Sequence, residues 1–183
     1  PHVYLSDYPE DELEAYITTY INEEIKMEGI VRKIPAFLNF LRLAALTNAQ
    51  QINFTQIGSD AGVSPTTIRE YYGILEDTLV GKSLEPWAKS KKRKAVSTAK
   101  FYFFDTGVVH ALSETKHLDR NSDLYGKSFE HWIFMEIRAY LSYHQKKEKL
   151  TYWRSQDQKE VDFVIGDTLA MRLHLPSGVG QLW

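Results

Sequence analysis

The sequence predicts a mixed α/β fold, in which helices dominate the first half of the chain and strands become frequent later. Three patterns support this prediction. Apolar side chains recur at helical spacing in residues 11–26 and 35–47, strand-like segments at residues 79–84 and 100–104 flank a basic run, and helix changes to strand after residue 108. The 183 residues are 43% hydrophobic and 13% aromatic, which is enough for one or two hydrophobic cores.

The first 50 residues are predicted to be helical. In residues 11–26, Leu13, Ile17 and Tyr20 share one face, and acidic residues in the first turn suit the helix dipole. Residues 35–47 form a second predicted helix that is apolar around much of its circumference. The first 28 residues carry eight acidic side chains against one lysine, so we expect this end of the chain to avoid nucleic acid.

The composition sets limits on the class of protein. The net charge is −2, and there is no cysteine, which rules out disulfides and thiol chemistry and is compatible with a cytoplasmic location. No apolar run reaches 18 residues and no signal peptide is recognisable, so we expect no membrane span and no membrane partner. Because the chain opens at Pro1 and not at Met, we expect it to be a piece of a longer protein.

Residues 53–81 have the layout of a helix-turn-helix. A short helix from Thr55 to Ala61 is expected to end at Gly62, because the turn needs a residue that tolerates positive φ. Ser64 can cap the next helix, and Pro65 suits its first position. The helix then places apolar residues at helical spacing, namely Ile68, Tyr72 and Leu75.

The start of this second helix supplies candidate DNA contacts. Arg69 can bind a guanine edge or a phosphate, and the hydroxyls of Ser64, Thr66 and Thr67 can donate to phosphates. Glu70 lies beside Arg69 and would repel a polyanion. Two interpretations therefore stay open: a recognition helix in the major groove of duplex DNA, or a winged helix that only joins protein domains.

The strand-like segments at residues 79–84 and 100–104 predict a wing with a basic tip between them. Five cationic side chains within six residues repel one another unless water or an anion surrounds them. The alternative is a solvated loop tip, but its position next to the helix-turn-helix favours a phosphate-binding tip. The candidate residues are Lys89, Lys91, Lys92, Arg93 and Lys94.

The last region holds a second candidate site. The helix predicted at residues 126–140 is apolar on nearly every side but contains Glu130, whose carboxylate needs a partner or a metal ion if it is buried. Strands are predicted at residues 150–154 and 160–165, and Asp162 lies on the second of them. Glu130 opposite Asp162 could hold Mg²⁺, whereas each acid by itself is also consistent with an ordinary surface carboxylate.

A series of segments carries a family resemblance. The most extended are Phe37-Leu-Asn-Phe-Leu-Arg-Leu-Ala44, Lys100-Phe-Tyr-Phe-Phe-Asp-Thr-Gly107 and Glu160-Val-Asp-Phe-Val164. In order and spacing, residues 4–170 resemble the C-terminal half of prokaryotic AAA+-type ATPases that carry a C-terminal domain of unknown function. In that family a P-loop ATPase module precedes a winged helix and a domain that resembles the PD-(D/E)xK restriction-endonuclease fold.

The resemblance implies roles for two acids and also shows departures. Glu130 matches the helix acid of the nuclease-like core, and Asp162 matches its strand aspartate. The acid-x-Lys pair of the full nuclease signature is missing from residues 168–175, so we expect no active catalytic residues and a degenerate domain. Residues 176–183 look unlike the family, which indicates a truncated or altered C-terminus.

The resemblance also implies an ATPase that this chain does not itself contain. There is no G-x-x-x-x-G-K-[ST] motif, so no nucleotide-binding loop exists in the sequence. No cofactor is therefore expected in this chain, and ATP and Mg²⁺ are implied only for a full-length relative with an upstream ATPase module.

These observations predict three regions. Residues 1–50 form a helical linker from the ATPase module, residues 51–107 a winged helix-turn-helix, and residues 108–183 a degenerate restriction-endonuclease-like α/β domain. The expected function is binding of duplex DNA by the winged helix. The alternatives are a protein-interaction module that couples the ATPase to a partner and a metal-dependent nuclease-like domain, and self-association is left open.

Overall fold

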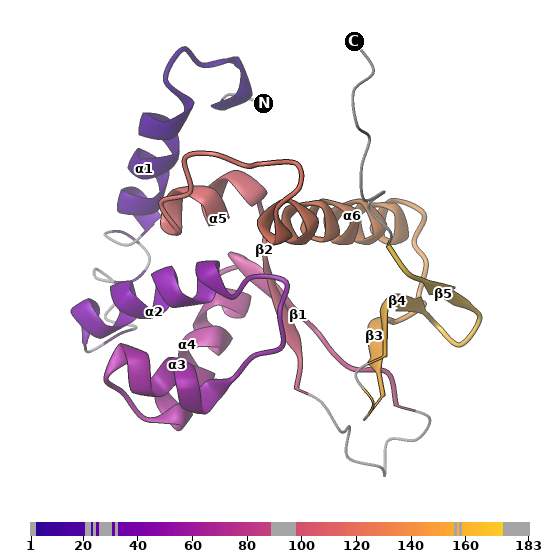
Figure 1. Ribbon diagram of the computed structural model, residues 1–183. Coiled ribbons are helices and arrows are strands. Elements are labelled where there is room, and N and C mark those ends of the chain that lie inside the picture. The colour runs from indigo at the N-terminus through magenta and orange to yellow at the C-terminus, as the bar shows by residue number, and fades with distance from the viewer. Residues whose placement is uncertain are drawn as a thin grey trace. The chain divides into compact units, whose positions relative to one another are not determined.

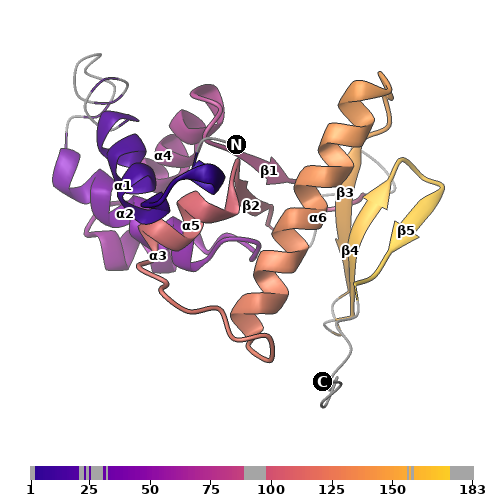
Figure 2. The same ribbon diagram turned by 90° about the horizontal axis from the view of Figure 1, so that it is seen from above.

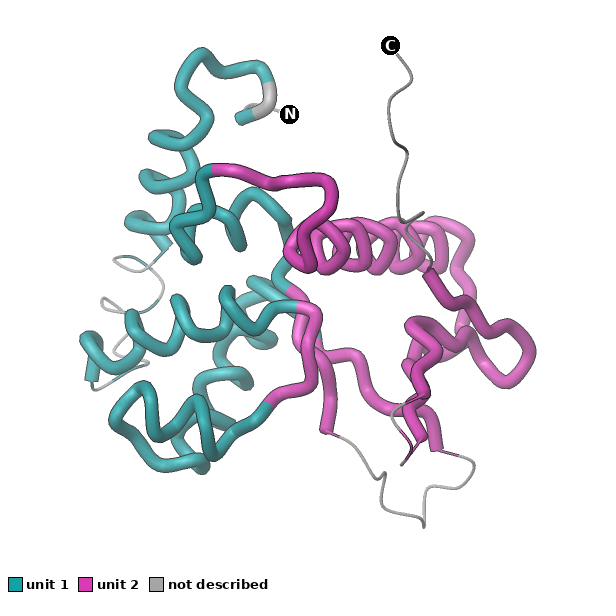
Figure 3. Tube along the Cα trace, in the orientation of Figure 1, with its two compact units in different colours: residues 1–48, 53–82, 103–116 teal, residues 49–52, 83–102, 117–183 magenta. Residues whose placement is uncertain are grey.

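The structure is a computed structural model that describes residues 3–20, 23, 25, 31, 33–88, 98–155, 157 and 159–173. It confirms the mixed α/β class, with helices and two small antiparallel sheets (Figure 1). The chain divides into two compact units (Figure 3). Unit 1 comprises residues 1–48, 53–82 and 103–116, and unit 2 comprises residues 49–52, 83–102 and 117–183. The predicted limits of the three regions stay predictions.

Unit 1 is built from helices. It contains the short 3-10 helix η1 (Val3–Leu5) and the α-helices α1 (Pro9–Tyr20), α2 (Ile34–Leu46), α3 (Phe54–Ala61), α4 (Pro65–Asp77) and α5 (Thr106–Leu112). An aromatic cluster lies between α2 and α4, where Phe40 meets Tyr72 edge-on at 4.9 Å and Phe37 meets Tyr71 edge-on at 5.0 Å between ring centroids. Such edge-to-face pairs stabilise a core beyond the area that they bury. These contacts hold α4 against α2.

The turn between α3 and α4 follows the predicted caps. Gly62 adopts φ 69°, a left-handed conformation that ends α3 at little steric cost. The Ser64 hydroxyl accepts a hydrogen bond from the Thr67 backbone N–H at 3.1 Å, and Pro65 occupies the first turn of α4. The Val63 N–H also donates to the Gly58 carbonyl at 3.0 Å, which brings the turn close to α3. The predicted ends of both helices at this turn are confirmed.

The first strand begins later than predicted. Leu79 adopts φ 60° and is 81% exposed, so β1 covers only Gly81–Leu84. The Val80 N–H bonds the Leu75 carbonyl at 2.8 Å and the Leu79 N–H bonds the Glu76 carbonyl at 3.2 Å, which is the hydrogen-bond pattern of a Schellman helix end. A leucine fills the place where glycine is usual, and for this reason the sequence pattern suggested a strand instead.

Strand β1 pairs with β2 (Lys100–Phe103) in a two-stranded sheet. The chain passes from unit 1 to unit 2 within β1 and returns within β2 (Figure 3). The expected basic tip, with Lys89, Lys91, Lys92, Arg93 and Lys94, lies outside the described residues.

Unit 2 packs one long helix against a sheet (Figure 2). Helix α6 (Asp123–Tyr143) lies beside the antiparallel sheet of β3 (Leu150–Arg154), β4 (Glu160–Ile165) and β5 (Leu169–Met171), in the order β3-β4-β5. The core includes Phe134 of α6 and Phe163 of β4, and the Tyr102 ring stacks on Phe134 at 4.1 Å. Helix α6 exposes Trp132 and Tyr140, so it is less buried than its apolar sequence indicated. Within the described residues, no helix is long and apolar enough to cross a membrane.

Two helical glycines should respond in opposite ways to substitution by alanine. A Cβ at Gly58 would lie 2.8 Å from the Val63 carbonyl oxygen, a backbone atom that can move only with the turn. We expect Gly58→Ala to destabilise the protein by about 1–3 kcal/mol through this overpacking. A Cβ at Gly73 would meet no atom of the described residues within 4 Å, so Gly73→Ala should stabilise the protein by about 0.5–1 kcal/mol.

Urea unfolding followed by circular dichroism measures both effects, and each variant serves as the control for the other. Equal changes in the free energy of unfolding for the two variants would contradict the described packing of the turn.

Candidate functional site

The first candidate site is the exposed surface of α4, where Arg69 is held in place by α3. The Arg69 side chain is exposed, and its guanidinium carbon lies 3.9 Å from the centroid of the Phe54 ring. The Phe54 ring in turn meets Tyr72 edge-on at 6.0 Å between centroids. Stacking of a guanidinium on an aromatic face restricts its orientation but leaves its N–H groups at the edge free to donate. The sequence predicted Arg69 as a contact but did not indicate Phe54 as its support.

The predicted hydroxyl contacts fall into two groups. Thr66 is exposed on α4, as expected for a residue that meets a ligand. Ser64 and Thr67 bond each other, with 3.0 Å between their hydroxyl oxygens, and Ser64 also caps the helix. Two hydroxyl hydrogens are available to this pair and one suffices for the bond between them, so one donor is left over.

The charges on this surface are mixed. Arg69 is the single cationic residue between positions 53 and 78. Three exposed acids occupy the same helices, namely Asp60 on α3 and Glu70 and Asp77 on α4. Asp60 accepts hydrogen bonds from the Gln56 side-chain amide at 3.0 and 3.1 Å. The surface of these two helices therefore offers one positioned cation and no positive patch.

The second candidate site is a buried polar cluster in unit 2. The Lys100 side chain is 4% exposed, and its ammonium lies 2.7 Å from Glu130 Oε1 and 2.5 Å from Glu160 Oε1. The Tyr102 hydroxyl donates to Glu130 Oε1 at 2.6 Å, and Arg154 Nη1 contacts Glu160 Oε2 at 3.1 Å. One buried cation thus joins β2, α6 and β4.

The protonation of the cluster follows from these contacts. Burial lowers the pKa of Lys100, but the carboxylates of Glu130 and Glu160 more than offset this, so its pKa lies above the ordinary value. Burial raises the pKa of Glu130, with a further increase from Asp162, against the lowering effects of Lys100 and Tyr102. Lys100 is therefore cationic at neutral pH and, together with Arg154, offsets the charges of Glu130 and Glu160.

The acids that were predicted to bind metal are both engaged within the protein. Glu130 accepts from Lys100 and Tyr102, and Asp162 Oδ2 accepts from the Leu173 backbone N–H at 2.7 Å. Among the described residues, no group of three or more His, Asp or Glu side chains is placed to hold a metal ion. The metal-binding role of Glu130 and Asp162 stays a prediction, and the structure supplies Lys100 as the partner that a buried Glu130 needs.

Sequence reasoning missed the role of Lys100. It is the first residue of a strand whose other members, at positions 101–103, are all aromatic and buried. A lysine in such a strand is rarely buried without a partner, and this was the available signal. The partner could not be identified, because Glu130 and Glu160 are 30 and 60 residues away and several acids lie at comparable distances along the chain.

Removal of Lys100 should be costly because it leaves Glu130 without its cation and Glu160 with Arg154 alone. We expect Lys100→Met to lower the free energy of unfolding by about 3–5 kcal/mol. Adding Glu130→Gln and Glu160→Gln to this variant should recover much of the loss, because the amides carry no charge. The matched control is Lys82→Met, which removes a half-exposed lysine with a 3.5 Å contact to Glu76 and should change stability by about 0.5 kcal/mol or less. Chemical unfolding of wild type, Lys100→Met, the triple variant and Lys82→Met measures these differences. A triple variant that is less stable than Lys100→Met would contradict the stabilising role of Lys100 in the cluster.

The stability difference between wild type and Lys100→Met should depend on pH in the alkaline range. The folded pKa of Lys100 is raised above 10.5, so its stabilising contribution is fully present below that pH and is lost as pH rises through the folded value. The stability difference between wild type and Lys100→Met should therefore be constant from about pH 7 to 10 and shrink at higher pH. Unfolding curves across this range test the sign, and a difference that grows above pH 10.5 would contradict it.

Comparison with known proteins places the chain in a protein family. Residues 1–119 match a family described as domain of unknown function DUF8612, and residues 125–173 match domain of unknown function DUF4143, a domain family associated with AAA-type ATPases. No solved structure matches.

Two curated relatives are similar to the chain, the uncharacterized protein Rv2008c of Mycobacterium tuberculosis and the uncharacterized protein Mb2031c of Mycobacterium bovis. Each is 29% identical over 157 residues, which cover 83% of this chain and 34% of the relative. The chain thus spans about a third of the length of these relatives. Because the first family match covers 119 of the 183 residues, the chain belongs to the DUF8612 family of proteins.

Proposed function

We propose that the α3–α4 part of unit 1 binds duplex DNA as a winged helix-turn-helix, with the exposed face of α4 in the major groove. The observation that carries the proposal is the exposed Arg69 guanidinium, stacked 3.9 Å above Phe54. A guanidinium in a fixed orientation can donate two parallel hydrogen bonds to the edge of a guanine. Thr66, on the same exposed part of the helix, supplies a hydroxyl for a neighbouring phosphate.

Gly73 supports close approach of another molecule to this face. It lies seven residues after Thr66, so both residues share one side of α4. A glycine inside a helix is less stable than alanine, and no described atom within 4 Å takes up the space that a Cβ would fill. The glycine is therefore not required by internal packing, and it leaves the face flat where a DNA backbone would lie.

The affinity for phosphate would come largely from the basic segment between β1 and β2. The α3–α4 surface carries acids at Asp60, Glu70 and Asp77, which oppose a polyanion. We therefore assign orientation and base contact to Arg69. We assign most of the charge neutralisation to the segment that contains Lys89, Lys91, Lys92, Arg93 and Lys94, on the strength of its sequence.

We place this DNA-binding part within an AAA+-type ATPase. The match of residues 125–173 to an ATPase-associated domain family supports this setting, and the curated relatives are about three times as long as the part that matches. In such a protein, ATP and Mg²⁺ belong to the upstream ATPase module, and the chain described here directs that module to DNA in the cytoplasm.

The same acids favour a second candidate function. A surface with one stacked arginine among three exposed acids also suits a protein partner with basic side chains. In that case the winged helix couples the ATPase to another protein, and Gly73 permits close packing of that partner instead of DNA.

DNA binding is tested by fluorescence anisotropy with a labelled duplex of about 25 base pairs at several salt concentrations. If about five phosphates are neutralised, log K should fall against log salt with a slope near −4 to −5. Replacing Lys91, Lys92, Arg93 and Lys94 by alanine should flatten that slope by about 3–4 units. The control is Lys146→Ala, which removes an exposed cation after α6 and should leave the slope unchanged.

Variants of α3 and α4 distinguish base contact from charge neutralisation. Arg69→Ala should weaken specific binding by about 1–3 kcal/mol, and Phe54→Leu should weaken it less, because the guanidinium remains but loses its support. Gly73→Ala should reduce DNA affinity although it stabilises the fold, a combination that a purely structural role does not give. Absence of binding at about 50 mM salt would overturn the DNA proposal in favour of the protein-interaction function.

A further inference from the structure

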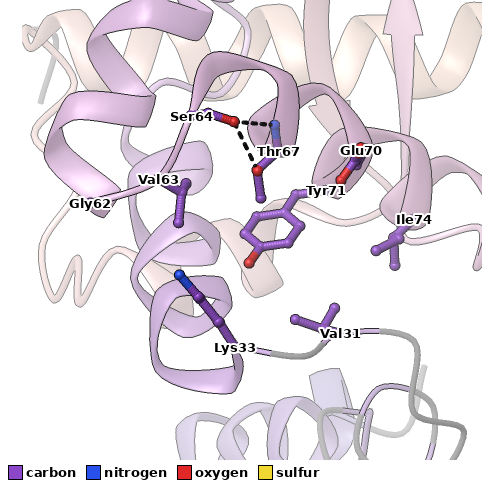
Figure 4. Close-up of a pocket in the computed structure, with 9 residues that line it drawn as sticks. All are labelled: Val31, Lys33, Gly62, Val63, Ser64, Thr67, Glu70, Tyr71 and Ile74. Carbon is purple, nitrogen blue, oxygen red and sulfur yellow. Dashed lines mark hydrogen bonds between the residues drawn. The ribbon is translucent and has the colours of Figure 1, made fainter.

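Unit 1 contains a pocket of about 710 Å³ along the flank of α4 (Figure 4). This volume lies within the range of sites that hold small molecules. Val31, Val63 and Ile74 supply apolar walls. Arg69 does not line the pocket, so the pocket is separate from the proposed base contact of the same helix.

Tyr71 gives the pocket a hydroxyl for which the described residues supply no hydrogen-bond partner. The residue is 5% exposed, and its ring packs against Phe37 and Phe40 at 5.0 and 5.3 Å between centroids. Its hydroxyl points into the pocket (Figure 4), and no described residue forms a hydrogen bond with it. Burial, with a contribution from the Glu70 carboxylate, raises the pKa of Tyr71, so the hydroxyl keeps its proton. A protonated hydroxyl in a pocket wall can donate a hydrogen bond to a bound acceptor.

Two opposite charges border the same space. The Lys33 ammonium extends into the pocket on the side of the Tyr71 hydroxyl, and Glu70 lies on the other side of the ring (Figure 4). Neither side chain forms an ion pair with a residue that the structure describes. Ser64 and Thr67 add the one hydroxyl donor that their mutual hydrogen bond leaves over. Among the lining residues that the structure describes, the pocket thus has a donor-rich end with one cation, Lys33, and an acidic end with one carboxylate, Glu70.

We propose that this pocket binds a small zwitterion of the α-amino acid class. Its carboxylate would accept from Lys33 and the Tyr71 hydroxyl, its ammonium would donate to Glu70, and its side chain would lie on the apolar walls. Glu70 disfavours a phosphate dianion, because it would sit beside a second negative charge without compensation. The inference stands apart from DNA binding, since it needs neither Arg69 nor the basic segment.

The pocket can be tested by titrating ¹⁵N-labelled protein with the standard free α-amino acids, up to about 10 mM each, and following backbone amide shifts in residues 62–74. One or more amino acids should shift these resonances with saturation. The same amino acid with its amine acetylated, the same amino acid as its carboxamide, and inorganic phosphate should each bind at least about tenfold more weakly.

Three variants identify the contacts. Tyr71→Phe keeps the ring packing and removes only the hydroxyl, so the protein should stay folded while the Kd rises about tenfold or more. Lys33→Met and Glu70→Gln should raise it at least as much, and Lys82→Met serves as the control with unchanged Kd. The proposal is overturned if no amino acid binds at about 10 mM, if Tyr71→Phe and Lys33→Met bind as well as wild type, or if phosphate binds as tightly. None of these results depends on DNA, so failure here leaves the DNA-binding proposal untouched.

Discussion

The burial of one lysine between two glutamates fixes the arrangement of unit 2. Lys100 comes from β2, Glu130 from α6 and Glu160 from β4, so a single ammonium joins three elements that lie far apart in the sequence. Burial of a charge is tolerated only when its partners are close, and here they lie at 2.7 and 2.5 Å. The aromatic stack of Tyr102 on Phe134 can then pack beside the cluster, because the Tyr102 hydroxyl is satisfied by Glu130.

This cluster also bears on the comparison with nucleases. A metal ion at Glu130 and Asp162 would have to compete with the ammonium of Lys100, which already occupies one oxygen of Glu130. Positive charge that a metal would supply in a nuclease is supplied here by a side chain of the protein. The geometry therefore supports a structural role for Glu130.

Local signals in the sequence were sufficient for the helix-turn-helix segment. Gly62, Ser64 and Pro65 act within one or two turns of the backbone, so their residue types alone located the helix ends correctly. Residue type alone did not predict the helix end at Leu79. Its left-handed conformation depends on the backbone hydrogen bonds that end α4 and on burial of Val80. The partners of Lys100 and the stacking of Arg69 on Phe54 could not be predicted either, because these residues meet only after folding. The mixed α/β class follows from periodicity, whereas the pairing of side chains across elements does not.

Helix α4 combines several roles on different sides. Ile68, Tyr72 and Leu75 form the side that packs in unit 1, Arg69 and Gly73 lie on the side proposed to meet DNA, and Tyr71 faces the pocket. The proposed contact of DNA with Arg69 and Gly73 is the central claim about this protein. Its most direct test is a map of amide shifts in ¹⁵N-labelled protein upon addition of a DNA duplex. If DNA lies against this side of α4, the shifts should be concentrated in residues 66–73 and in the basic segment. Shifts confined to the basic segment, with α4 unchanged, would contradict it.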